Sequence, residues 1–192
     1  MTNAMNEIST RRLFMRNTGM AALSAGGILM LAGKDASAAS QGDMASDVGI
    51  LNVALGLEHE GINAYTLGAK SGLLQPAVLD IAVKFQSDHK VHRDALINTI
   101  RSLGGAPVEE KTLDEYAKSL NASTLKTQAD VLKLALQLEL GAANAYLGVI
   151  PSFKDINLSK ISARLAADEV SHWTILNNAL GMALPKPLNF GA

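Results

Sequence analysis

The sequence predicts an all-α fold, a four-helix bundle made of two repeated helical hairpins that a long crossover joins. The composition is the first observation, because few aromatic residues (4%) and abundant Ala and Leu favour packed helices over sheets. The second is that apolar side chains recur every three or four residues in four long segments. The third is an internal repeat. With 192 residues, the chain is long enough for one domain with a substantial core.

The repeat has two parts. Residues 54–65 and 135–146 share the pattern A-L-x-L-E-x-x-x-x-N-A-Y at an offset of 81. Residues 88–98 and 168–178 share D-[HE]-x-x-H-x-x-x-L-x-N at an offset of 80. A duplicated pair of helices explains both patterns, and each pair carries a Glu on one helix and a His on the other.

Residues 1–38 have the layout of an export signal and do not contribute to the predicted fold. A pair of arginines at 11 and 12 precedes an apolar run over 19–33, and the small residues Ala-Ser-Ala end at Ala38. The arginine pair resembles a twin-arginine signal, which implies the twin-arginine export machinery as a partner. We expect a periplasmic or otherwise exported protein that is soluble after cleavage near Ala38. The alternative is a retained membrane anchor, but the apolar run is short and rich in Gly.

Charge and cysteine content exclude other classes of function. Cleavage at Ala38 would remove four of 17 basic and two of 18 acidic residues, so the remaining chain is mildly acidic. Such a chain offers no basic surface for nucleic acid. The chain has no Cys, so any metal must be held by His and carboxylate side chains.

The first hairpin follows a short linker. Residues 39–46 are small and polar and predict the linker, and the apolar periodicity predicts a helix over 47–68. Pro76, which suits the first turn of a helix, begins a second periodic segment over 76–103 that ends at Gly104. The short loop between the two helices makes them antiparallel.

The second hairpin follows a long crossover. A capping-box pattern predicts a short helix over 113–119, and two further long helices are expected over 128–149 and 158–180. The crossover is long because the chain must run the length of the bundle before the second hairpin starts. The bundle thus spans 47–181, and the Pro-containing segment 182–192 predicts an extended tail.

Several polar side chains fall on the apolar faces of these helices. Glu58 and Glu139 lie in the middle of apolar stripes, where a carboxylate is costly unless it is paired, protonated or bound to metal. Residues three apart on a helix can reach one centre, and the repeated D-[HE]-x-x-H pattern supplies two such pairs. The candidate metal ligands are therefore Glu58, His89, His92, Glu139, Glu169 and His172.

These residues resemble the ferritin-like family of di-metal carboxylate bundles. In that family, one Glu on each of two helices and a Glu-x-x-His on each of the others bind the metals. Residues 168–172 also resemble the family's D-E-x-R-H motif, with Ser171 where Arg is usual. The resemblance implies that Asp88 and Asp168 orient the ligating histidines.

Position 89 departs from the family pattern, which would place a Glu where this chain has His89. Three inner carboxylates neutralise two divalent ions less well than four. Three hypotheses are compatible with the sequence: a di-metal site with altered ligands, a single metal, or a site that no longer holds metal. Asp88 is a candidate to replace the missing carboxylate.

Four other residues near these motifs carry weaker expectations. Tyr65 and Tyr146 are expected to be core aromatics whose hydroxyls bond a nearby carboxylate. His59 and Glu60 are adjacent to Glu58 but off its face, so we expect them to be surface residues or contacts for a partner.

The sequence thus predicts an exported ferritin-like protein that binds one or two iron or manganese ions, with zinc as another fit to these ligands. As an enzyme it would be a metal-dependent oxidoreductase acting on oxygen or peroxide, and metal handling is the related role. The alternative is a non-catalytic bundle that acts as a structural or partner-binding envelope protein. Iron storage in a homo-oligomeric shell is a third hypothesis.

Overall fold

The computed structural model describes residues 41–188 and 190, and this part of the chain is helical with no strand. Four long helices form the bundle, with short helices in the connections. They are α3 (Gln41–Lys70), α4 (Pro76–Ser102), α5 (Leu113–Ser119), η1 (Ala122–Thr124), α6 (Gln128–Val149), η2 (Ile150–Ser152) and α7 (Ile156–Ala179). The predicted export signal over 1–38 lies outside the described residues. Among the described helices, none is both long and apolar enough to cross a membrane.

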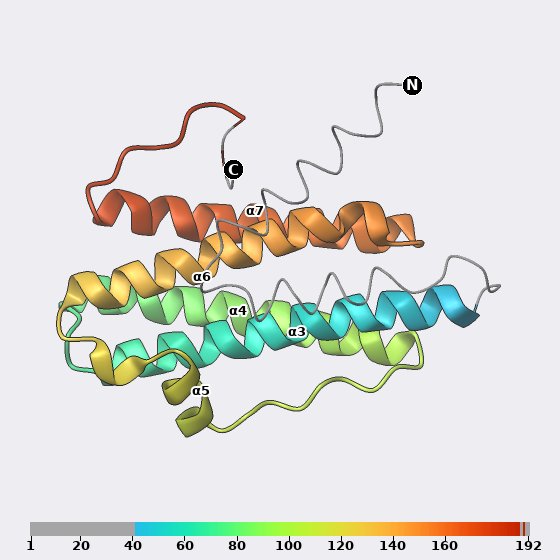
Figure 1. Ribbon diagram of the computed structural model, residues 1–192, viewed down its shortest axis with the longest axis horizontal. Helices are drawn as coiled ribbons and strands as arrows, with labels where there is room; N and C mark the ends of the chain where they lie inside the picture. Colours follow the sequence, from blue (N-terminus) through green and yellow to red (C-terminus); the bar gives the residue numbers. More distant parts are fainter. Residues whose placement is uncertain (1–40, 189, 191–192) are drawn as a thin grey trace, which may run out of the picture.

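The long helices form two antiparallel hairpins, α3 with α4 and α6 with α7 (Figure 1). Helix α3 also packs on α6, which joins the hairpins into one bundle. After α4 the chain runs back along the bundle to α5, so α6 starts at the same end as α4 (Figure 1). The two hairpins are therefore related by an approximate twofold rotation across the bundle axis, as the sequence repeat predicts.

Helix α3 begins at Gln41, so the prediction of a linker over 39–46 is wrong for residues 41–46. Asp47 is buried, and its carboxylate accepts hydrogen bonds from the backbone N–H groups of Lys154 and Asp155. These bonds fix the helix against the connection between α6 and α7. Once a helix is nucleated, extension by a further turn costs little, and no Pro opposes it here.

An asparagine of α3 holds the first part of the crossover. The side chain of Asn52 donates to the carbonyl of Ala106 (3.0 Å) and accepts from the backbone N–H of Val108 (2.7 Å). Thr112 then starts α5 with a complete capping box that includes Glu115. The crossover consequently covers the outer side of α3, with α5 packed against it.

The apolar core is divided into two clusters, one toward each end of the bundle. The first contains nine buried residues from the N-terminal half of α3, the C-terminal half of α4 and the facing ends of α6 and α7, among them Leu55, Leu96 and Tyr146. The second occupies the opposite end and includes Tyr65, Phe85 and Trp173. Polar side chains fill the layer between the clusters, where the candidate site lies.

The segment after α7 folds back along this helix without forming a helix or strand in residues 182–188. The side-chain amide of Asn177 donates to the carbonyl of Met182 (2.9 Å). The ring of Phe190 packs edge-on against Trp173, with centroids 5.1 Å apart. The tail thus covers the outer part of the second apolar cluster.

Candidate metal centre

The structure brings all six candidate ligands together in the middle of the bundle. Each long helix contributes through its inner face, and α4 and α7 contribute two residues each because a spacing of three keeps both on one face. All are buried, with exposed fractions of 6% or less: Glu58, His89, His92, Glu139, Glu169 and His172. Only metal binding, protonation or pairing makes such a buried set of ionisable groups stable.

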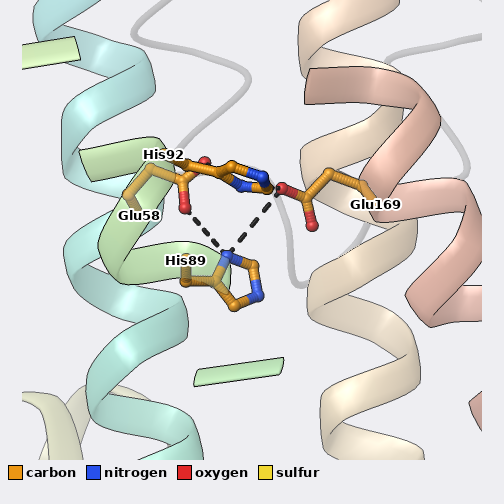
Figure 2. A group of neighbouring side chains, drawn as sticks. All are labelled: Glu58, His89, His92 and Glu169. Atoms are coloured by element: carbon orange, nitrogen blue, oxygen red, sulfur yellow. Dashed lines mark hydrogen bonds and ion pairs between the residues drawn. The ribbon is translucent and has the colours of Figure 1, made fainter. Parts of the chain in front are cut away.

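The side chains form two overlapping groups, and Figure 2 shows the first, in which Glu58, His89, His92 and Glu169 converge from three helices. His89 Nδ1 lies 2.8 Å from Glu58 Oε2. His92 Nδ1 lies 3.2 Å from Glu169 Oε1. One donor atom from each of the four residues lies within 4.8 Å of the others, the spacing needed to hold one metal ion.

The second group shares two residues with the first and consists of His89, Glu139, Glu169 and His172. His89 Nε2 lies 3.2 Å from Glu139 Oε1, and His172 Nδ1 lies 3.4 Å from Glu139 Oε2. His89 and Glu169, which occupy equivalent positions in the repeat, are thus common to both groups. They occupy the centre of the site, and the other ligands lie around them.

Two aspartates set the orientation of the outer histidines, and each comes from the opposite hairpin. Asp168 Oδ2 lies 3.2 Å from His92 Nε2, and Asp88 Oδ2 lies 3.3 Å from His172 Nε2. An ionised carboxylate can only accept a hydrogen bond, so Nε2 carries the hydrogen in each ring. When the ring is neutral, the Nδ1 lone pair therefore points toward the carboxylates at the centre, the orientation that a metal ligand requires.

The tyrosines hold the carboxylates, again across the two hairpins. The hydroxyl of Tyr65 on α3 donates to Glu139 Oε1 on α6, and the hydroxyl of Tyr146 on α6 donates to Glu58 Oε1 on α3. Each Tyr shares a face with the Glu seven residues before it, yet it bonds the Glu of the other repeat. Both tyrosines are buried, and both bonds fix a carboxylate that belongs to the candidate site.

Several buried nitrogen and oxygen atoms at this centre, all of which could bind a metal ion, have no hydrogen-bond partner. They are His92 Nδ1, His172 Nδ1, Glu139 Oε2 and both carboxylate oxygens of Glu169. Buried polar atoms are almost always paired, so a cluster of unpaired ones requires an explanation. A bound metal ion explains it, because these atoms are the nitrogen and oxygen ligands that iron, manganese and zinc accept. The residues present therefore fit a metal ion.

Burial and mutual pairing shift the acidities of the carboxylates in opposite directions. Burial raises the pKa of Glu169 to about 7, with a further contribution from Glu139 beside it. Burial alone would raise the pKa of Glu58 and Glu139. Contacts with His89 and His92 lower the pKa of Glu58, and contacts with Glu169, His172 and His89 lower the pKa of Glu139, so both values end below the usual one. Glu169 is therefore the carboxylate that most readily takes up a proton when no metal is bound.

The histidines take up protons more readily than a free imidazole. Burial opposes this, but the carboxylates Glu169 and Glu58 raise the pKa of His92 to about 10. Burial also opposes protonation of His172, yet Glu139 and Glu169 raise its pKa to about 9. Without metal, protonated histidines balance the buried carboxylates, and a metal ion has to displace these protons to bind.

The ring of His89 lies directly against α3 at Gly61. A Cβ atom added to Gly61 would lie 3.3 Å from Cε1 and from Nδ1 of His89. The repeat has Ala142 at the position equivalent to Gly61, and Glu169 at the position equivalent to His89. The missing side chain at position 61 thus provides room for an imidazole where the other repeat carries a carboxylate.

His59 is buried, with 4% of its surface exposed, so the expectation of a surface position for it is wrong. The crossover covers this side of α3, where the side chain of Asn63 donates to the carbonyl of His59 and to the Glu110 carboxylate. The residue equivalent to His59 in the second repeat is the apolar Leu140, so the sequence did contain a signal that position 59 is buried. Glu60 is only half-buried, and burial raises its pKa.

Comparison with known proteins decides the family. A sequence model of the ferritin-like domain matches residues 46–182, which is most of the chain. This chain belongs to the ferritin-like family. The family and the all-helical fold expected from the sequence are therefore confirmed, and the ferritin-like match covers all six candidate ligands.

The crystal structure of a conserved hypothetical protein from Mycobacterium tuberculosis is similar to this ferritin-like chain. The two share 23% sequence identity and a TM-score of 0.60, over 79% of this chain and 99% of that one. At this identity the likeness supports the fold alone. A search of curated proteins found no match.

Proposed function

We propose that this ferritin-like protein is an exported metalloprotein that binds iron or manganese at the centre of its bundle. The observation that carries the proposal is the set of unpaired, buried donor atoms on His92, His172, Glu139 and Glu169, which face one another across the bundle. Zinc also accepts these ligands, but the carboxylate-rich set suits the harder ions. A bound iron or manganese ion would supply redox chemistry with dioxygen or peroxide, or the protein would store or deliver the metal.

The ligand set favours two inequivalent positions for metal. A neutral imidazole has one free lone pair, so His89 can serve one ion of a pair but not both. Glu169 has two carboxylate oxygens, so it would serve as a ligand in both groups. One position would therefore have four protein ligands, and the other would have three and keep more open sites for a small molecule.

The surrounding residues each have a role in holding such a centre. Asp88 and Asp168 would keep the Nδ1 atoms of the outer histidines directed inward and raise their basicity. Tyr65 and Tyr146 would prevent Glu139 and Glu58 from rotating away. The two apolar clusters would exclude water from both ends of the site.

Export is the second part of the proposal. It is supported by the arginine pair at 11 and 12, the apolar run over 19–33 and the small residues that end at Ala38. The twin-arginine machinery exports folded proteins, so a metal bound in the cytoplasm would be carried out with the chain.

Metal content tests the proposal directly. The full chain, purified from cells grown with iron and manganese, is expected to contain one or two ions per chain by elemental analysis. The double substitution His92→Ala and His172→Ala should abolish binding, because it removes the two outer ligands. His59→Gln is the matched control, because His59 is the one remaining histidine outside the cluster. Absence of metal from the native chain would refute the proposal.

One observation favours a second candidate, a bundle without metal that acts through its surface on a partner in the envelope. His89 contacts Glu58 with Nδ1 and Glu139 with Nε2. A protonated His89 can therefore donate a hydrogen bond to each carboxylate and offset their negative charge without a metal ion. This candidate predicts that a chelator leaves the melting temperature of the purified protein unchanged. A bound metal predicts that the chelator lowers the melting temperature.

A further inference from the structure

One end of the bundle contains an apolar cavity that borders the candidate metal centre. It has a volume of about 50 Å³ and lies between all four long helices, on the side of the site where Tyr65 is found. Apart from Tyr65, every side chain that lines it belongs to Gly, Ala, Val, Leu or Ile. Ile81 and Ile175, both partly exposed, line its outer part, so it opens toward solvent between α4 and α7.

The cavity breaks the symmetry of the repeat. It is lined by Gly68 and Ala82, whose equivalents in the second hairpin are Val149 and Ser162. Val149 is buried, and the hydroxyl of Ser162 donates to the carbonyl of Tyr146 (2.7 Å), so larger side chains occupy these positions at the other end. The cavity therefore exists at one end of the site because Gly68 and Ala82 are smaller than Val149 and Ser162, their equivalents at the other end.

The lining determines which molecules this space accepts. A water molecule needs two to four polar partners to be stable in a cavity, so water that enters this space from solvent is held weakly and an apolar molecule can displace it. The hydroxyl of Tyr65 is already bonded to Glu139. A space of about 50 Å³ exceeds the roughly 10–15 Å³ that one water requires, but it is smaller than the 150 Å³ cavity that binds benzene in an engineered protein. The cavity suits a very small, uncharged, apolar molecule.

The inner wall of the cavity is part of the site itself. Gly61 and Tyr65 both line it. Gly61 lies against the ring of His89, and the Tyr65 ring is 5.5 Å from the His89 ring, centroid to centroid. The cavity therefore adjoins residues that contact His89 and Glu139.

We propose that this cavity binds small apolar molecules and is the route by which dioxygen, rather than peroxide, reaches the centre. The assignment of dioxygen rests on the proposed function. Dioxygen is small and apolar, whereas hydrogen peroxide would lose hydrogen bonds to water that the lining cannot replace. The cavity itself is independent of metal, because residues of the bundle form it.

Xenon provides the first test, because it is small and apolar and requires no metal. Crystals of the metal-free protein under xenon pressure should show one xenon site among Ala82, Leu132 and Leu176. Ala82→Leu should fill the cavity and remove this site, whereas Ala95→Leu, at an exposed position of the same helix, should retain it. Ala135→Val is a milder way to fill the same space if Ala82→Leu does not fold. Absence of xenon from the native cavity would overturn the proposal.

The second test compares two oxidants on the iron-loaded protein. Ala82→Leu should slow the oxidation of bound ferrous iron by dioxygen several-fold and leave its oxidation by hydrogen peroxide unchanged, relative to Ala95→Leu. Equal slowing of both reactions would refute the dioxygen route. If the protein binds neither iron nor manganese, the proposed function fails, while the xenon result still decides whether the cavity binds apolar molecules.

Discussion

At the scale of single residues, His89 is the position that sets the charge of the site. Its two nitrogens contact Glu58 and Glu139, and its pKa is raised well above the usual value because these carboxylates overcome the effect of burial. A Glu at this position would add a fourth carboxylate with two oxygen atoms. Two divalent ions carry four positive charges, which the present three carboxylates do not fully neutralise. Four carboxylates would neutralise them.

His89→Glu is therefore expected to increase the metal content of the protein toward two ions per chain. The carboxylate is smaller than the imidazole, so Gly61 leaves enough room for it. His89→Gln is the matched control, because it has the length of Glu without its charge. The number of ions per chain after dialysis, determined by elemental analysis, tests the expectation. Equal metal content in the two variants would contradict it.

At the scale of helices, side-chain caps fix where two of the four ligand-bearing helices, α6 and α7, start. Helix α6, which carries Glu139, begins with a capping box in which Thr127 Oγ1 accepts from the backbone N–H of Asp130 (3.2 Å). The Asp130 carboxylate in turn accepts from the backbone N–H of Thr127 (2.9 Å). Glu139 lies three turns further along, so the cap acts on the stability of the helix and not on the geometry of the site.

Thr127→Ala should lower the free energy of unfolding by about 0.5–2 kcal/mol, the usual cost of losing an N-cap side chain. Thr127→Ser keeps the hydroxyl and should cost much less. Urea unfolding of both variants gives the difference. Their metal content should equal that of the native protein. A loss of metal in Thr127→Ala would show that the cap also positions Glu139.

At the scale of the whole molecule, the bundle keeps a layer of ionisable groups between two apolar clusters. When no metal is bound, protons on the histidines stabilise this layer. The pKa values of His92 and His172 are raised from 6.5 to about 10 and about 9, so the folded state binds these protons more tightly than the unfolded state does. This contribution is complete below 6.5 and disappears as the pH rises through 9 and 10.

The metal-free protein should thus become less stable as the pH increases from 6.5 to 10. Each proton that only the folded state retains changes the free energy of unfolding by about 1.4 kcal/mol per pH unit. Denaturant unfolding at several pH values measures the slope. The manganese-loaded protein should show a smaller decrease, because metal has replaced the protons. Constant stability of the metal-free protein over this range would contradict the expectation.

Much of the fold and of the candidate site could be predicted from the residues. Apolar periodicity and the positions of Pro76 and Gly104 gave the long helices closely, because these signals act locally along the chain. The six candidate ligands were identified because each lies on an apolar face where an ionisable side chain needs a partner. The start of α3 and the burial of His59 were missed, because both depend on segments distant in sequence that pack against α3.

The sequence by itself determined the repeat, the four helices and the residues that face the interior, because helical periodicity fixes the face on which a side chain lies. Only the tertiary structure decided which residues meet. Asp88 contacts the histidine of the other hairpin, and Tyr65 bonds Glu139 rather than the Glu on its own helix. The cavity at one end likewise depends on packing. The physical reason is that the pairing of helices follows from the fit of whole surfaces, which no single helix encodes.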